Sequence, residues 1–229
     1  DVCSSDLRGR GDELHRVVIQ RVDKDDKALG GVPVFEPHDR DAIDDDGVEL
    51  VRDAQVVRRG ERLLAQIVEE EFFRKLADKD FMRIAVLLAR KGYNEGGCPI
   101  GGVVISNDTR QILGKGHNTL VQENHPYNHG ETSAIRDSGR QDFSQTTIFT
   151  TLSPCDVCAT LLYMRQFNRV VVGDVTNASG NEALLRRKGV QVDVLEDPEG
   201  IALYAKYRSE KPDQDLEDWK GLAAVRKNG

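Results

Sequence analysis

Three features are scarce in this 229-residue sequence, and each scarcity excludes a class of protein. No stretch approaches 18 consecutive apolar residues, which excludes a membrane-spanning helix of ordinary length. Four cysteines are too few for a small secreted domain held together by disulfide bonds. The first residues also lack the basic start and apolar core of a secretory signal. We therefore expect a soluble protein with a cytoplasmic location and no membrane partner.

Positive charge is also in short supply, and the imbalance lies in one part of the chain. Lys and Arg number 32 against 39 Asp and Glu, which gives a formal net charge of −7. Residues 1–78 contain 13 basic and 20 acidic side chains, whereas residues 79–229 contain 19 of each. Proteins that bind polynucleotides usually carry an excess of Lys and Arg to contact phosphates. We therefore expect a small uncharged ligand and no polynucleotide partner.

The first third of the chain has a weak pattern for a folded domain. One short strand is predicted over residues 14–19, and turn formers with an acidic run from Gly30 to Asp46 predict a solvated linker. From Glu61 onward, apolar residues recur at helical spacing and predict an amphipathic helix whose stripe forms core or interface: Leu63, Leu64, Ile67, Val68, Phe72 and Leu76. We expect residues 1–60 to be a leader, flexible or artefactual in part, and residues 61–229 to form the functional domain.

Helices and strands are predicted to alternate from Lys79 to the end of the chain. Periodicity and turn residues predict helices over 80–93, 129–138, 156–167, 180–189, 198–208 and 212–222. Strands are predicted over 102–106, 111–118, 146–152, 168–174 and 190–195, the first two joined as a hairpin. This alternation predicts an α/β protein with helices on both faces of a central sheet.

Candidate metal ligands fall in two tight groups, each at the start of a predicted helix. His129 and Glu131 begin one helix, and Cys155 and Cys158 begin another, 26 positions after the histidine. One imidazole and two thiolates suit a tetrahedral zinc ion with a fourth position open to water. Glu131 is expected to point into this site without being a ligand. A carboxylate beside such a water can take its proton and deliver it to a substrate.

A structural zinc site with four protein ligands is the alternative interpretation of the same residues. It would need a fourth ligand, and Cys98, His117 and His125 are the candidates. No second pair of Cys or His residues has ligand spacing, and a purely structural site has no use for Glu131. The sequence therefore favours an open catalytic zinc site, with a non-enzymatic zinc-binding protein as the alternative.

The pattern His-x-Glu followed by Pro-Cys-x-x-Cys is the signature of zinc-dependent deaminases. Longer segments between residues 80 and 219 resemble the fungal-type cytosine deaminases of the cytidine deaminase-like superfamily: GYNEGGCPIGGVVI, GKGHN, HGE, TTLSPCDVC, VVVGD and EKPDQDLED. The resemblance implies a three-layer α/β/α sandwich with a five-stranded mixed central sheet. It also implies one Zn²⁺ per subunit, a homodimer and the hydrolysis of cytosine to uracil and ammonia.

The resemblance also implies roles for residues around the zinc ion. Asn118 would hydrogen-bond the edge of the base, and the backbone of Gly130 would face the carbonyl oxygen of the base. Ile100 and Leu152 would form walls of the pocket. Asp218 would contact the exocyclic amine, although the acidic C-terminal segment could also be merely solvated.

Two departures from the family pattern leave the substrate open. The loop over residues 174–180 lacks the aromatic ring that the family places over the base, and Asp215 stands at a second aromatic position. Trp219 could restore this wall of the pocket or could pack on the domain surface. A roomier pocket would admit isocytosine, guanine, creatinine or a nucleoside as alternative substrates. A tRNA adenosine deaminase shares the zinc motif, but the neutral charge of residues 79–229 disfavours it.

Overall fold

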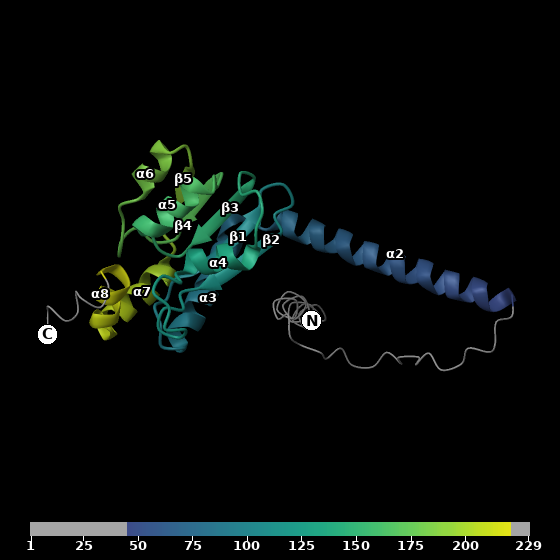
Figure 1. The fold of residues 1–229 in the computed structure, drawn as a ribbon, viewed down its shortest axis with the longest axis horizontal. Coiled ribbons are helices and arrows are strands. Elements are labelled where there is room, and N and C mark those ends of the chain that lie inside the picture. The colour runs from purple at the N-terminus through teal and green to yellow at the C-terminus, as the bar shows by residue number, and fades with distance from the viewer. Residues whose placement is uncertain (1–44, 221–229) are drawn as a thin grey trace, which may run out of the picture. The chain divides into compact units, whose positions relative to one another are not determined.

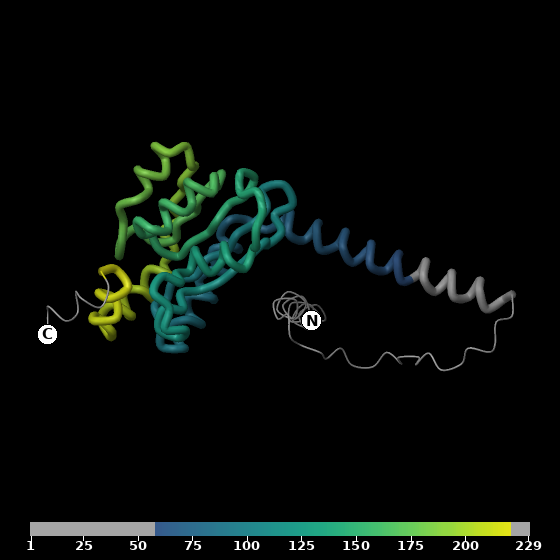
Figure 2. Tube along the Cα trace, viewed as in Figure 1, coloured from purple at the N-terminus to yellow at the C-terminus, as the bar shows by residue number. Residues whose placement is uncertain are grey.

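The computed structural model describes the backbone of residues 45–220 and the side chains of residues 58–220, the coloured part of Figure 2. Contacts divide the chain into two units, Asp1–Val56 and Val57–Gly229, and the second contains every site residue discussed below. The predicted strand over residues 14–19 and most of the predicted linker over residues 30–46 lie outside the described residues. Among the described helices, none combines the length and apolar character needed to cross a membrane.

The described elements alternate as the sequence predicts (Figure 1). In chain order they are α2 (Asp45–Lys75), α3 (Asp78–Asn94), β1 (Gly101–Ser106), β2 (Ile112–His117), α4 (Gly130–Ser138), β3 (Thr146–Thr150), α5 (Asp156–Met164), β4 (Arg169–Val172), α6 (Glu182–Arg187), β5 (Gln191–Val194), α7 (Pro198–Glu210) and α8 (Pro212–Lys220). The start of one helix differs clearly from the prediction: α2 begins at Asp45, whereas the sequence predicts a helix from Glu61.

The five strands form one mixed sheet in the order β2-β1-β3-β4-β5. β1 pairs antiparallel with both β2 and β3, which confirms the predicted hairpin. β3, β4 and β5 run parallel to one another, each joined to the next through a helix. The carboxyl ends of β3 and β4 therefore lie at the same edge of the sheet, where connecting loops commonly carry a site.

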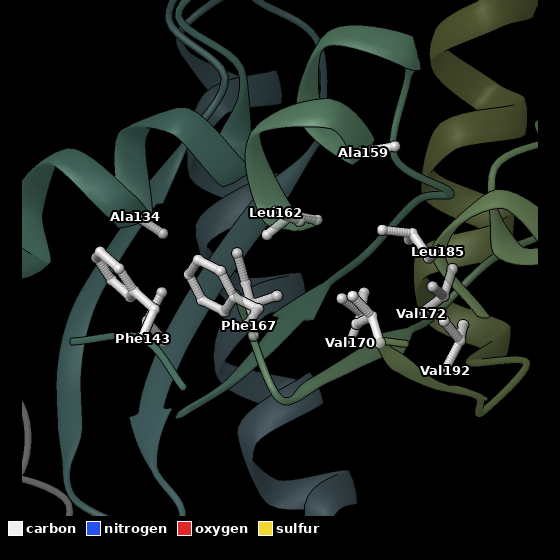
Figure 3. Packing of buried hydrophobic residues seen from close by; sticks show 12 residues of the cluster. Ala134, Phe143, Ala159, Leu162, Phe167, Val170, Val172, Leu185 and Val192 are labelled. Atoms are coloured by element: carbon white, nitrogen blue, oxygen red, sulfur yellow. The ribbon is translucent and has the colours of Figure 1, made fainter. Parts of the chain in front are cut away.

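Alternate side chains of the strands supply two separate hydrophobic clusters, one on each face of the sheet. Val103, Ile105, Phe149 and Val171 pack against α3 on one face. On the other face the strands and helices α4, α5 and α6 contribute a second set (Figure 3): Val104, Ile148, Val170, Val172, Ala134, Leu162 and Leu185. Helices thus cover both faces, and the predicted three-layer α/β/α sandwich with a five-stranded mixed sheet is confirmed.

The sequence predicts that the apolar stripe of α2 forms core or interface, and four of its members lie outside the core, which leaves the interface as the prediction for them. Leu63, Leu64, Ile67 and Val68 are 48 to 67% exposed in the single chain. Further along, Phe73 and Leu76 are partly buried against the cluster that includes α3.

Four charged side chains connect the start of α3 to strands β4 and β5 and to the turn between β1 and β2. Arg169 at the start of β4 contacts Asp78 at 2.7 Å and Asp193 of β5 at 2.5 Å. Arg110 approaches Asp78 at 2.9 Å from the turn between β1 and β2. Partial burial alone would raise the pKa of Asp78, but the two guanidinium groups outweigh that effect and lower it. The carboxylate therefore stays ionised and connects α3 to β4 and to the turn between β1 and β2.

Gly101 allows α3 to lie directly against β1, and this contact gives a prediction about stability. A Cβ atom at Gly101 would lie 2.0 Å from the backbone oxygen of Ala85. The Gly101→Ala substitution must push helix and strand apart, so we expect the free energy of unfolding to fall by about 3 kcal/mol. Urea denaturation followed by circular dichroism measures this change.

The matched control for this prediction is Gly60→Ala in α2. Apart from the backbone of its own helix, no described residue comes within 4 Å of a Cβ placed at Gly60, and alanine favours a helix interior by about 1 kcal/mol over glycine. The control should leave the free energy of unfolding unchanged or slightly raised. Equal stability of Gly101→Ala and the control would contradict the close contact.

Candidate active site

Two helix starts place the candidate metal ligands. His129 is the N-cap residue of α4, and Cys155 is the N-cap residue of α5. Both have extended backbone angles, with φ −74° and ψ 171° for His129 and φ −67° and ψ 173° for Cys155. Cys158 follows in the first turn of α5 and is fully buried. The structure therefore brings together the three residues that the sequence predicts as ligands.

The distances between the three ligand atoms fit a zinc ion. His129 Nδ1 lies 3.4 Å from the sulfur of Cys155 and 3.5 Å from the sulfur of Cys158. All three ligand atoms lie within 4.8 Å of one another. A tetrahedral zinc with its usual bond lengths to nitrogen and sulfur places these atoms about 3.6 Å apart. The imidazole and the two thiols are therefore close enough to hold one zinc ion.

The candidates for a fourth protein ligand lie in other contacts. His117 has Nδ1 at 2.9 Å from the backbone oxygen of Asn118 and Nε2 at 3.1 Å from Lys91 Nζ. The ring of His125 packs edge-on against Tyr127, and the thiol of Cys98 contacts Asp218. Across residues 58–220, the ligand group contains His129, Cys155 and Cys158 and no fourth member. This arrangement favours the open site over the closed structural site.

The electrostatics of the three ligands favour a cation among them. The side chain of Cys158 lies in contact with Cys155, and this contact lowers the pKa of Cys155 to about 4, with His129 adding to the effect. The same contact, together with burial, raises the pKa of Cys158 well above its usual value. Burial alone would lower the pKa of His129, but contact with Cys155 and the charge of Glu131 raise it. A thiolate and a carboxylate thus attract positive charge to this point.

Glu131 lies beside the ligand group as predicted. It is 3% exposed, and its Oε2 atom lies 3.5 Å from the sulfur of Cys158. The Thr150 hydroxyl donates a hydrogen bond of 3.2 Å to Oε1 and fixes the other oxygen. Burial raises the pKa of Glu131, and the negative charge of Cys155 raises it further. A carboxyl group with a raised pKa is suited both to take up and to release a proton.

Thr150 is a site residue that the sequence analysis missed. It is the last residue of β3 and is fully buried, with its hydroxyl 3.2 Å from Glu131. The only signal in the sequence is a threonine at the carboxyl end of a buried strand.

Asn118 carries an unused hydrogen-bond donor. Its side chain is 1% exposed, and Oδ1 accepts a hydrogen bond of 3.1 Å from the backbone of Leu120. This contact fixes the orientation of the amide, and Nδ2 has no partner among the described residues. The backbone nitrogen of Asn118 also donates to the oxygen of Ile100 at 2.8 Å. A buried, unpaired donor is costly unless a ligand satisfies it.

Two of the predicted wall residues belong to a third hydrophobic cluster. Ile100 and Leu152 share it with Cys98, Tyr204 and Tyr207, and Ala178 packs at its edge. The small side chain of Ala178 in the 174–180 loop agrees with the missing aromatic ring.

Gly130 lies against one of these wall residues. A Cβ atom at Gly130 would come within 2.7 Å of the oxygen of Ile100, so the start of α4 lies directly against the loop before β1.

The C-terminal helix α8 carries the last two predicted contacts. Tyr207 donates a hydrogen bond of 3.2 Å to Asp218, and burial raises the pKa of Asp218 to about 6. Asp218 lies near enough to His129 for its charge to help raise the pKa of that histidine. Trp219 is 38% exposed, and its indole nitrogen donates to the Tyr204 hydroxyl at 2.8 Å. A direct contact between Trp219 and the substrate stays a prediction.

Comparisons with known proteins find relatives among the deaminases. Residues 76–174 match the family model of the cytidine and deoxycytidylate deaminase zinc-binding region. The chain is 43% identical to the cytosine deaminase of Candida albicans over 145 residues, which is 62% of this chain and 93% of that relative. It is 33% identical over 101 residues to a tRNA-specific adenosine deaminase of Buchnera aphidicola, covering 42% of this chain and 61% of that relative.

A solved guanine deaminase of Nitrosomonas europaea shares the fold. It is 17% identical to this chain with a TM-score of 0.53, and the match covers 58% of this chain and 85% of that one. At this level of identity the likeness concerns the fold alone.

Proposed function

Because the chain belongs to the cytidine and deoxycytidylate deaminase zinc-binding family, whose members hydrolyse carbon–nitrogen bonds, we propose that it converts free cytosine to uracil and ammonia. One observation carries the hydrolytic part of this proposal. The buried carboxyl of Glu131 lies 3.5 Å from a thiol of a three-ligand zinc site. The match to nearly the whole length of a cytosine deaminase supports the choice of base.

Glu131 would carry the protons of the reaction. When bound, zinc would lower the pKa of a water molecule toward neutrality. Glu131 would take one proton from the attacking water, whose oxygen bonds to the amine-bearing carbon, and would deliver that proton to the adjacent ring nitrogen. It then moves the remaining proton of the water to the amine, and the carbon–nitrogen bond breaks. The oxygen of the water stays on the ring as the new carbonyl, and ammonia leaves.

The other site residues would hold the ring. We propose that the unpaired Nδ2 of Asn118 donates to the edge of the base, and that the backbone of Gly130 faces its carbonyl oxygen. Ile100 and Leu152 would pack against the ring. Asp218 would accept a hydrogen bond from the exocyclic amine. Each contact matches a polar or apolar part of a small uncharged base.

The equal numbers of basic and acidic residues in positions 79–229 support a free base over a tRNA. Isocytosine, guanine, creatinine and nucleosides are the other small substrates to be tested. The homodimer that the resemblance implies and the cytoplasmic location stay predictions.

An ammonia-release screen tests the proposed function. The full chain, loaded with zinc, is incubated with free bases, nucleosides, creatinine and tRNA, and ammonia is measured. We expect cytosine to give the highest kcat/KM. Release of ammonia from one of the other compounds, with none from cytosine, would overturn the assignment of substrate and keep the reaction class.

We also propose that residues 61–229 contain the complete catalytic unit. Phe73 and Leu76, the residues near the end of α2 that pack against the domain, remain after deletion of residues 1–60. We therefore expect the shortened chain to keep its kcat/KM for cytosine and its thermal unfolding midpoint largely unchanged. An unfolded or inactive product would show that the N-terminal segment belongs to the domain.

A further inference from the structure

Helix α8 is attached to α7 mainly through polar groups. α8 has no fully buried residue, although Asp218 lies on it beside the candidate site. The Tyr204 hydroxyl donates to Asp215 at 2.5 Å, and Arg208 donates to the same carboxylate at 3.0 Å. The Tyr207 hydroxyl donates to Asp218 at 3.2 Å. These hydrogen bonds, more than apolar burial, determine where Asp218 lies.

The two tyrosine–aspartate pairs also fix the register between the helices. Tyr204 and Tyr207 are three residues apart in α7, and Asp215 and Asp218 are three residues apart in α8. Both tyrosines are 1% exposed or less, so their hydroxyls depend on protein partners. Sliding α8 along α7 would break both pairs at once.

Cys98, which is 120 positions before Asp218 in the sequence, contacts the same Asp218 carboxylate. It lies in the loop before β1, is fully buried and forms a hydrogen bond with Asp218. Burial, with the nearby charge of Asp218, raises the pKa of the Cys98 thiol well above its usual value, so it remains a neutral donor. Ile100 follows two residues later and packs with Leu152 in the same cluster as Cys98 and Tyr207.

We propose that Tyr207 and Cys98 are positioning residues that orient the Asp218 carboxylate toward the amine of the substrate, an inference that rests on the proposed function. A carboxylate offers about four lone-pair positions, and two core donors leave the others for a ligand. The orientation favours a ring with an N–H group at that point. A ring with a carbonyl there would place two acceptors together, so the product uracil binds less tightly than cytosine.

Steady-state kinetics with cytosine separate positioning from general stability. The Tyr207→Phe variant keeps the ring and removes only the hydroxyl, so we expect KM to rise about tenfold with kcat changed far less. Zinc content should stay at one ion per chain. Tyr93→Phe is the matched control, because the Tyr93 hydroxyl also donates to a carboxylate, that of Glu210, without contacting Asp218. Its KM should equal that of the unmodified protein.

Two substitutions at Cys98 give a rescue test. Cys98→Ala removes the donor and should raise KM, whereas Cys98→Ser keeps a hydroxyl donor and should restore it. If Cys98 had only a structural role, the two variants should show similar increases in KM, because neither alanine nor serine is larger than cysteine. Similar KM values for the alanine and serine variants would overturn the role of Cys98.

A binding measurement provides a readout that does not depend on turnover. In the Glu131→Gln background, isothermal titration with cytosine and uracil measures affinity without reaction. Adding Tyr207→Phe should weaken cytosine binding about tenfold and reduce the preference over uracil. If the protein deaminates cytosine but Tyr207→Phe changes neither KM nor affinity, the positioning role is wrong. If it neither binds nor deaminates cytosine, the proposed function is wrong and the inference falls with it.

Discussion

Replacing Glu131 with glutamine is expected to reduce ammonia release from cytosine by about 10³-fold or more, because the amide cannot take up and deliver protons. The substitution preserves size, and the glutamine oxygen can still accept the hydrogen bond from Thr150. His129, Cys155 and Cys158 are unchanged, so the zinc content should stay at one ion per chain. Kinetic assays and metal analysis of the same preparation measure both quantities.

Glu199→Gln is the control for this prediction. Glu199 undergoes the same chemical change on the exposed surface of α7, where it pairs with Arg90. Its turnover should match that of the unmodified protein. Substantial turnover in Glu131→Gln, with zinc present, would refute the role of Glu131 as the proton carrier.

Replacing Cys158 with serine is expected to remove both zinc and activity. Serine has nearly the same volume, but its hydroxyl is a poor zinc ligand, and two protein ligands would remain. We expect the affinity for zinc to fall by at least about 100-fold, a change larger than that for most residues that only support a ligand. Competition with a chelator of known affinity measures the loss, and ammonia release should fall to background.

Cys98→Ser is the matched control, because Cys98 is an equally buried thiol outside the ligand group. This variant should bind zinc as the unmodified protein does. If it lost zinc to the same extent as Cys158→Ser, the closed site with four protein ligands would be the correct interpretation.

Each half of the ligand group could be predicted from the sequence because the geometry within it is local, whereas the fold has to bring His129 to the two cysteines across 26 and 29 positions. A residue at a helix start and a residue within the first turn necessarily lie close together, as Cys155 and Cys158 do. The same local rule places Glu131 next to His129. The contacts that support these residues could not be predicted in this way. Thr150 and Glu131 are 19 positions apart, and only the packing of α4 against the sheet brings them together.

The contacts of α7 with α8 show a second limit to what could be predicted from the sequence. The sequence predicts both helices, but spacing within each helix does not say which side chains of the two helices meet. Tyr204 and Tyr207 have the pattern of ordinary buried aromatic residues, and their hydroxyl contacts with Asp215 and Asp218 emerge only from the structure.

Helix α2 begins earlier than the periodicity predicts. The predicted linker ends at Asp46 and lies mostly outside the described residues, and the helix begins at Asp45. Acidic residues stabilise the first turn of a helix because they interact with its positive end. Periodicity correctly predicted the helix after residue 60. It could not show that Leu63, Leu64, Ile67 and Val68 are exposed, because a repeat identifies a shared face and not what covers it.

β5 is an edge strand of the sheet. The unpaired backbone groups of an edge strand can pair with a strand from another molecule. This edge strand has only four residues, and one of them is Asp193, which forms an ion pair with Arg169. Gln191 also donates its side-chain amide to Asp193. A short strand that carries charge is a poor template for further pairing. Asp193, the last member of the ion-pair chain that starts at Asp78 of α3, thus also places a charged side chain on this edge strand, a feature that disfavours pairing with another molecule.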